Sequence, residues 1–117
     1  MEINLQPFKN STSSVFTGRP QGEQAREKLN LSSIDNNEEN VDIIIPADTT
    51  SFNPSFFLGL LFHSIQKLGI EKFKEKYNFI ISTDDPNLHD VIENNINDGY
   101  RNAINSLKNK NGLFSGL

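Results

Sequence analysis

The side chains best suited to chemistry in this chain lie in one polar segment, DTTSFNPS, at positions 48–55. The segment contains one carboxylate and four hydroxyl groups, carried by Asp48, Thr49, Thr50, Ser51 and Ser55. A hydroxyl can accept a phosphoryl group, and a carboxylate can bind Mg²⁺ or act as a general base. The chain has no cysteine and only two histidines, and no cluster of histidine or lysine accompanies the segment to complete a mechanism. We therefore predict a protein that is not an enzyme, without catalytic residues, metal or cofactor, and regard this segment as a candidate for phosphorylation or partner binding.

Two predicted elements position the segment. Before it, Val41–Ile45 is almost continuously apolar and β-branched, which is typical of a buried central strand. After it, Asn53 is a favourable N-cap and Pro54 a favourable first helical residue, so we predict a helix that begins there and ends at Gly69. The segment therefore lies between the carboxyl end of a strand and the N-terminus of a helix, where α/β domains commonly recognise phosphates, ligands and partners.

The helix predicted over 54–68 has two different sides. One side carries a continuous apolar stripe, formed by Phe57, Leu61, Ile65 and Leu68. The opposite side includes Phe62, which either packs beneath a neighbouring element or anchors a partner that Gly59 allows to approach closely. These two interpretations differ in how exposed Phe62 is. The partner-binding residues that we predict from this segment and this side of the helix are Asp48, Asn53, Ser55, Gly59, Phe62 and His63.

Ser55, in the first turn of that helix, also has two interpretations. Its hydroxyl can form a hydrogen bond with a nearby backbone group, as serines at helix starts commonly do. Alternatively it is a phosphoacceptor, because the free N–H groups and the positive end of the helix dipole stabilise a phosphate there. Thr49, Thr50 and Ser51 in the preceding loop are alternative acceptors.

A second polar turn, at Gly18 and Arg19, precedes another predicted helix. Pro20 is favourable in the first turn of that helix, which we expect to continue to Leu29. The backbone N–H groups of the turn and the Arg19 guanidinium could bind an anion. The alternative is a simple turn with a charged surface residue, because the turn lacks the Lys-Ser/Thr pair of a P-loop and the three-glycine spacing of a dinucleotide site.

The remaining patterns predict an α/β fold with a small mixed sheet of about four strands covered by helices, in the order β-(β)-α-β-α-β-α. The strands expected besides Val41–Ile45 are an edge strand over 2–8, a short strand at 15–16 and a buried strand at 79–82, and the polar stretches 32–40 and 47–52 are expected loops. A short amphipathic helix is expected over 70–77, and a long one from the Asp85-Pro86 start to Asn111-Gly112. We expect a single domain over 1–112 and a flexible tail over 113–117.

Composition excludes several classes of protein. The 117 residues carry a formal net charge of −4, which argues against a general nucleic-acid-binding protein. The longest apolar run, at 56–62, contains a glycine and is too short to span a bilayer. The N-terminal residues lack the basic and apolar regions of a secretory signal. We therefore expect a cytoplasmic protein that binds neither nucleic acid nor membrane, and the many Asn, Ile and Lys residues suggest an AT-rich bacterial genome.

The chain resembles a bacterial STAS-like family of unknown function, related to the STAS domains of anti-sigma-factor antagonists. The resemblance covers residues 15–82, and its short motifs are Gly18-Arg19, Gly22, Arg26, Ser55-Phe56, Gly69 and Glu71-Lys72-Phe73. It implies a STAS-like fold and a signalling partner such as a histidine-kinase-type ATPase. In the antagonists the corresponding helix begins with Asp-Ser-Ser-Gly, and its first serine is phosphorylated. Here Asn53 replaces the acid and Pro54 the phosphoacceptor, so only the second serine, Ser55, remains, and it is rotated by about 100° along the helix.

Three hypotheses about function follow. The first is a non-enzymatic STAS-like regulatory module that binds a signalling protein through the 48–55 loop and the exposed side of the helix, and that is gated by phosphorylation. The second is a small-ligand or nucleotide-binding domain that uses Asp48, Arg19 and the same helix N-terminus. The third is a structural subunit in which Phe56, Phe57 and Phe62 contribute to a homodimer contact.

Overall fold

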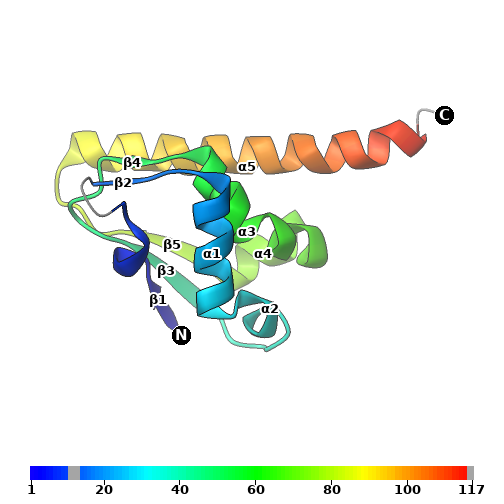
Figure 1. Cartoon of the computed structure of the whole chain (residues 1–117), viewed down its shortest axis with the longest axis horizontal. Helices are drawn as coiled ribbons and strands as arrows, with labels where there is room; N and C mark the ends of the chain where they lie inside the picture. The colour runs from blue at the N-terminus through cyan, green and yellow to red at the C-terminus, as the bar shows by residue number, and fades with distance from the viewer. Residues whose placement is uncertain (11–13, 116–117) are drawn as a thin grey trace.

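The computed structural model describes residues 1–10 and 14–115 of the chain, with side chains up to residue 108. The fold is α/β, as predicted. In chain order the elements are β1 (Glu2–Asn4), the 3-10 helix η1 (Gln6–Phe8), β2 (Val15–Phe16), α1 (Arg19–Leu29), α2 (Leu31–Ile34), β3 (Val41–Ile45), β4 (Ser51–Phe52), α3 (Pro54–Leu68), α4 (Ile70–Lys76), β5 (Tyr77–Ile81) and α5 (Pro86–Ser115). Figure 1 shows α5 running past the rest of the molecule towards the C-terminus.

The strands form two small parallel sheets. The larger sheet has three strands in the order β1-β3-β5, and Ile43 in its centre is aligned with Ile3 on one side and Phe79 on the other. The two-residue strands β2 and β4 pair separately. The prediction of one mixed sheet of about four strands is therefore wrong, because the pairs that the structure describes are all parallel and β2 belongs to a second sheet.

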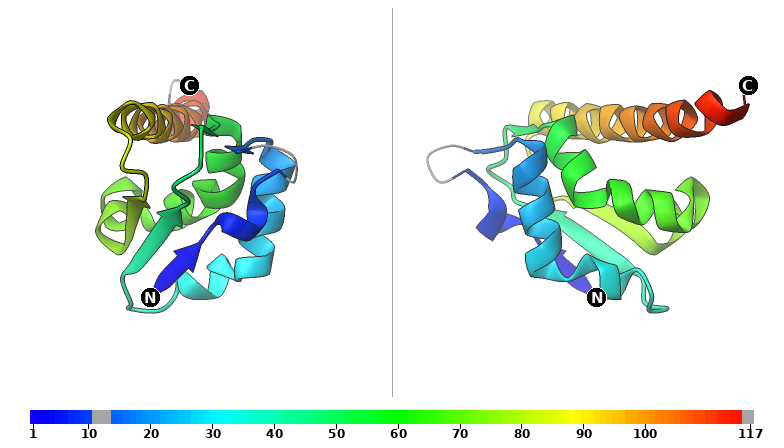
Figure 2. Two further views of the ribbon diagram at one scale, coloured as in Figure 1. Left: turned by 90° about the vertical axis from the view of Figure 1, so that its left-hand side faces the viewer. Right: turned by 45° about the vertical axis from the view of Figure 1, so that its right-hand side comes forward.

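The helices cover only one face of the three-stranded sheet. In β3 the alternate residues Val41, Ile43 and Ile45 are almost completely buried, as expected of the central strand. The intervening residues point to the other face, where Asn78 and Ile80 of β5 are exposed. Figure 2 shows α1, α3 and α5 arranged around the covered side. Parallel sheets are usually covered on both faces, so this open face is a departure from the common pattern.

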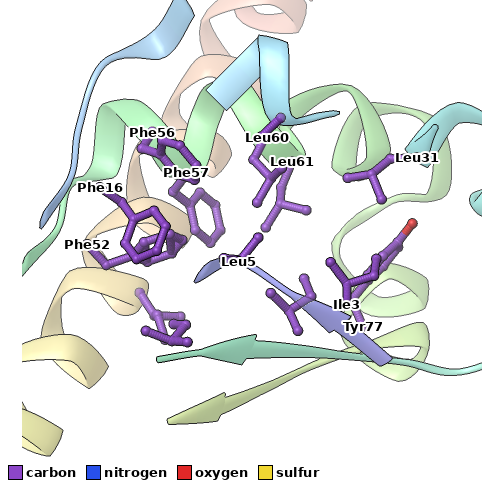
Figure 3. Packing of buried hydrophobic residues seen from close by; sticks show 14 of the residues in the cluster. Ile3, Leu5, Phe16, Leu31, Phe52, Phe56, Phe57, Leu60, Leu61 and Tyr77 are labelled. Atoms are coloured by element: carbon purple, nitrogen blue, oxygen red, sulfur yellow. The ribbon is translucent and has the colours of Figure 1, made fainter. Parts of the chain in front are cut away.

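The core between sheet and helices is rich in phenylalanine. Phe16 of β2 and Phe52 of β4 lie with their rings perpendicular and 5.7 Å apart, and Phe56 of α3 packs against both. Figure 3 shows these rings beside Phe57, Leu60 and Leu61, with Leu5 and the strand that carries Ile3 below them. The short second sheet is therefore held mainly by the aromatic side chains that it contributes to the core, since two-residue strands form few hydrogen bonds.

Two glycines bring α1 and α3 unusually close together. A Cβ atom on Gly22 would lie 2.3 Å from the carbonyl oxygen of Phe56, and one on Gly59 would lie 2.1 Å from that of Arg19. Both distances are far below van der Waals contact. The backbones of the two helices therefore touch directly, and only glycine fits at either position.

Local signals located most element boundaries, with some exceptions. The expected loops contain the short helix α2 and the strand β4, and the last strand begins at Tyr77, two residues earlier than expected. The edge strand expected over 2–8 ends at Asn4, because residues 6–8 around Pro7 form the 3-10 helix η1 instead. Helix α5 continues to Ser115, so Asn111-Gly112 does not end it as predicted. Of the predicted tail, residues 116–117 lie outside the described part of the chain. No helix in that described part has the length and apolar character needed to cross a membrane.

Candidate functional site

The loop between β3 and α3, residues 46–53, is held in place by backbone hydrogen bonds to the segment around β2. The Thr50 N–H donates to the Ser14 carbonyl at 2.8 Å, and the Asn53 N–H donates to the Phe16 carbonyl at 2.8 Å. These bonds fix the loop at its middle and at its end. The loop is therefore a defined surface rather than a free connection.

Asp48 projects from the tip of this loop into solvent, with 61% of its side chain exposed. Its carboxylate forms an ion pair with Lys9, whose ammonium donates a hydrogen bond that holds the pKa of Asp48 below its usual value. The stem of Lys9 is largely buried, with only 9% of the side chain exposed. Asp48 is thus presented in its charged form at an accessible position.

The four candidate hydroxyls differ sharply in exposure. Thr50 is exposed, and its hydroxyl makes one long hydrogen bond, of 3.3 Å, to the Ser14 carbonyl. Thr49 is 1% exposed, and its hydroxyl has no hydrogen-bond partner among the residues that the structure describes. Ser51 and Ser55 are half-buried. Thr50 is therefore the candidate acceptor that another protein can reach most easily.

Ser55 connects the N-termini of two helices. Its hydroxyl accepts a hydrogen bond from the Gly18 N–H at 3.1 Å and donates one to the Asn53 side chain at 2.7 Å. The Asn53 side chain also accepts from the Ser55 N–H at 2.8 Å, which confirms Asn53 as the N-cap of α3. Of the two interpretations of Ser55, this geometry supports the one in which the hydroxyl bonds nearby backbone.

The two residues of the predicted anion site, Gly18 and Arg19, make different contacts within the chain. The Gly18 N–H points at Ser55, and Gly18 has a φ of +93°, which favours glycine. The Arg19 guanidinium lies 5.7 Å from the centre of the Phe62 ring, in a cation–π contact. The Gly18 N–H is therefore already used within the chain, whereas the exposed Arg19 side chain forms no hydrogen bond or ion pair with the described residues.

The side of α3 that we expected to be exposed is covered by α1. Gly59 is buried against Arg19, and Phe62 is only 5% exposed. The prediction that Gly59 and Phe62 form an accessible contact surface is therefore wrong, because the chain's own helix takes the place of a partner. His63, in contrast, is exposed.

The phenylalanines proposed for a homodimer contact are also internal. Phe56 and Phe57 are fully buried in the core of the single chain. The Phe57 ring packs on Gly99 of α5, where a Cβ atom would lie 2.4 Å from the ring. These side chains therefore offer no apolar surface to a second copy.

Sequence reasoning missed a buried polar network that joins four elements. The Arg26 guanidinium donates to the Asp35 carboxylate at 3.0 Å, to the Ser64 hydroxyl at 2.7 Å and to the Leu60 carbonyl at 3.1 Å. The Asp35 carboxylate, fully buried, also accepts from the Ser64 hydroxyl at 2.8 Å and from the Tyr77 hydroxyl at 2.5 Å. Arg26 is one of the residues on which the STAS-like resemblance rests, but nothing local in the sequence relates it to its three partners.

The network also affects Tyr77. Burial of the phenol, together with the neighbouring Asp35 carboxylate, raises the pKa of Tyr77 well above its usual value of 10.0. The phenol therefore stays protonated and continues to donate to Asp35. None of the fully buried polar atoms of the network lacks a hydrogen-bond partner among the described residues, and we interpret the network as structural.

The described residues include no candidate metal site. Among residues 1–10 and 14–108, no group of three or more His, Asp or Glu side chains is placed to hold a metal ion. The two histidines lie on different helices, with His63 on α3 and His89 on α5. No protein-family model matches the chain, and neither the curated proteins nor the solved structures include one with significant similarity to it.

Proposed function

We propose that this protein is a regulatory protein-interaction domain of the STAS-like kind, which recognises a signalling partner through the 46–53 loop. The observation that carries the proposal is the combination of order and exposure in this loop. Backbone bonds to the β2 segment fix it, while Asp48 and Thr50 project into solvent. A preorganised polar loop binds with little loss of conformational freedom, which favours recognition of a protein surface.

Thr50 is the hydroxyl through which we propose that binding is gated. Phosphorylation adds between about −1.5 and −2 charges at neutral pH. On Thr50 this charge would lie two residues from the exposed carboxylate of Asp48, so it would change the loop from weakly to strongly acidic. A partner that binds the unmodified loop would then be repelled, or one with basic residues would be recruited.

The resemblance to the anti-sigma-factor antagonists suggests the type of partner, a histidine-kinase-type ATPase or a related signalling protein. In those proteins the gating residue lies in the first turn of the helix. In this chain Pro54 and the hydrogen bonds of the half-buried Ser55 make that turn unsuitable, and the accessible hydroxyl lies in the loop just before it. The proposal therefore moves the gate by a few residues while it keeps the same surface.

Affinity purification from a lysate of the source organism, followed by mass spectrometry, tests the proposal. The baits are the wild type, Thr50→Asp and, as a control for added surface charge elsewhere, Ser33→Asp on the exposed side of α2. We expect a partner that the wild type and Ser33→Asp retain equally and that Thr50→Asp loses or gains. Identical sets of retained proteins for all three baits, with no phosphate on residues 49–55, would refute the proposal.

A further inference from the structure

The free edge of the three-stranded sheet at β5 lies beside a cavity of about 410 Å³. This volume is within the range of ordinary ligand pockets, about 300–1,000 Å³. The cavity is lined by β5 together with residues of α4 and α5: Lys74, Tyr77, Asn78, Phe79, Ile81, His89, Glu93, Ile96 and Tyr100. It is separate from the 46–53 loop, so an inference about it does not depend on the function proposed above.

The backbone of β5 presents unpaired hydrogen-bonding groups to this cavity. The Ser82 N–H donates to the Ile45 carbonyl at 3.2 Å, so the even-numbered residues of β5 direct their backbone groups towards β3. Successive residues of a strand point to opposite sides, so Phe79 and Ile81 direct their N–H and C=O groups away from the sheet. Among the described residues these groups have no hydrogen-bond partner.

The two edges of the sheet are protected very differently. The other edge strand, β1, has only three residues, and its outward-facing positions are Glu2 and Asn4. A short strand with a charged residue is a common protection against strand addition. The five residues of β5, YNFII, include no charge and no proline. An unprotected edge of this length invites pairing with another strand.

The walls of the cavity indicate the chemistry of that strand. The Lys74 ammonium lies 4.7 Å from the centre of the Tyr100 ring and forms no ion pair with a described carboxylate. Glu93, across the cavity, is 3.5 Å from His89. Lys74 is therefore available to a carboxylate, while Tyr100 and the buried Ile96 provide an apolar surface.

We propose that this cavity binds an extended peptide segment of a partner protein, which adds as a fourth strand along β5. An aliphatic side chain of the peptide packs on Tyr100 and Ile96, and an acidic residue pairs with Lys74. Backbone bonds to Phe79 and Ile81 supply affinity, and these two side-chain contacts supply specificity.

Selection from a phage-displayed library of random linear peptides against the wild-type protein provides the probe. Affinities of a selected peptide are then compared by fluorescence anisotropy. Ile81→Pro removes an outward N–H without removing a bond to β3, and Ile81→Ala is its control because it loses the side chain but keeps the N–H. Lys74→Glu reverses the charge in the cavity, and Lys72→Glu reverses an exposed charge on the same helix away from it.

We expect the selected peptides to share an aliphatic and an acidic residue, and to bind about tenfold more weakly to Ile81→Pro and to Lys74→Glu than to their controls. The amides of Phe79 and Ile81 should gain protection from hydrogen exchange when the peptide binds. If Ile81→Pro fails to fold, the two lysine variants and the hydrogen-exchange measurement still test the proposal. Equal binding to both lysine variants, protection confined to another surface, or failure to select any peptide would overturn the proposal. A wild-type dimer that Ile81→Pro abolishes would overturn it in favour of a second copy.

Discussion

The buried network around Arg26 gives the sharpest test of how this fold is held together. We consider Arg26→Met, Asp35→Leu and the double variant. Arg26→Met keeps most of the length of the side chain but removes the cation, so the Asp35 carboxylate, 0% exposed, keeps only the hydroxyls of Ser64 and Tyr77 as donors. The perturbation therefore isolates the cost of a buried charge without its counter-charge.

The expected magnitudes differ for the single and double variants. Removing one member of a buried ion pair typically costs about 3–5 kcal/mol, a large part of the total stability of about 5–15 kcal/mol for a single domain. Replacing both charges by apolar side chains removes that penalty, but it leaves the hydroxyls of Ser64 and Tyr77 without their acceptor, at about 1–3 kcal/mol each. The double variant should thus be less destabilised than the sum of the two single variants, by about 1–3 kcal/mol.

Urea denaturation followed by far-ultraviolet circular dichroism measures these free energies of unfolding. Arg101→Met is the matched control, because Arg101 forms an exposed pair with Asp98 at 2.8 Å and 68% of its side chain is exposed. Exposed pairs contribute little, so we expect a change of about 0.5 kcal/mol or less. The reasoning would be refuted if Arg26→Met were no more destabilising than Arg101→Met, or if the two network substitutions were additive.

Three further predictions concern Gly59, Asn53 and the two tyrosines. Gly59→Ala should destabilise the protein by about 1–3 kcal/mol in urea, despite a gain in helix propensity, because its Cβ would lie 2.1 Å from the Arg19 carbonyl; unchanged or greater stability would contradict this. Asn53→Ala should cost about 0.5–2 kcal/mol through loss of the N-cap bond to α3, and an unchanged urea midpoint would contradict that. Burial raises the pKa of Tyr100 to about 12 and that of Tyr77 still further, so neither phenol should ionise near pH 10 in the folded protein. Both phenols ionise near pH 10 in the unfolded chain, so the free energy of unfolding should fall as the pH rises above 10. Tyrosinate absorbance with a midpoint near pH 10 in the folded protein would contradict the last prediction.

The parts of the fold that the sequence predicted well are those that depend on short-range chemistry. Asn53 and Pro54 fix the start of α3, Gly69 fixes its end, and an Asp85 side chain accepts from the Asn87 N–H at the start of α5. In each case the capping residue lies next to the helix that it begins or ends. Such signals do not depend on the rest of the fold, so local rules suffice to interpret them.

The errors arise where a local preference was weak or too short to detect. A glycine in a helix costs only about 1 kcal/mol relative to alanine, so Gly112 does not stop a helix that other residues favour, and α5 continues to Ser115. Strands of two residues, such as β4, contain no detectable alternation. Phe52 is fixed there by the core and by its N–H, which donates to the Asn95 side chain of α5 at 2.8 Å. That contact spans 43 residues and leaves no trace in the local sequence.

The largest error concerned the side of α3 that carries Gly59 and Phe62. An apolar residue beside a glycine on a second helix face indicates that something packs closely there, but it does not say whether that is a partner or the same chain. Gly22 of α1 decides between these two alternatives, because direct backbone contact between two helices requires a glycine on each helix at the crossing. Since α1 supplies the second glycine, it occupies the site, and a partner could reach Phe62 only by displacing a helix whose Arg26 anchors the buried network. The binding that we propose for this protein therefore uses surfaces that the fold leaves open, namely the 46–53 loop and the β5 edge.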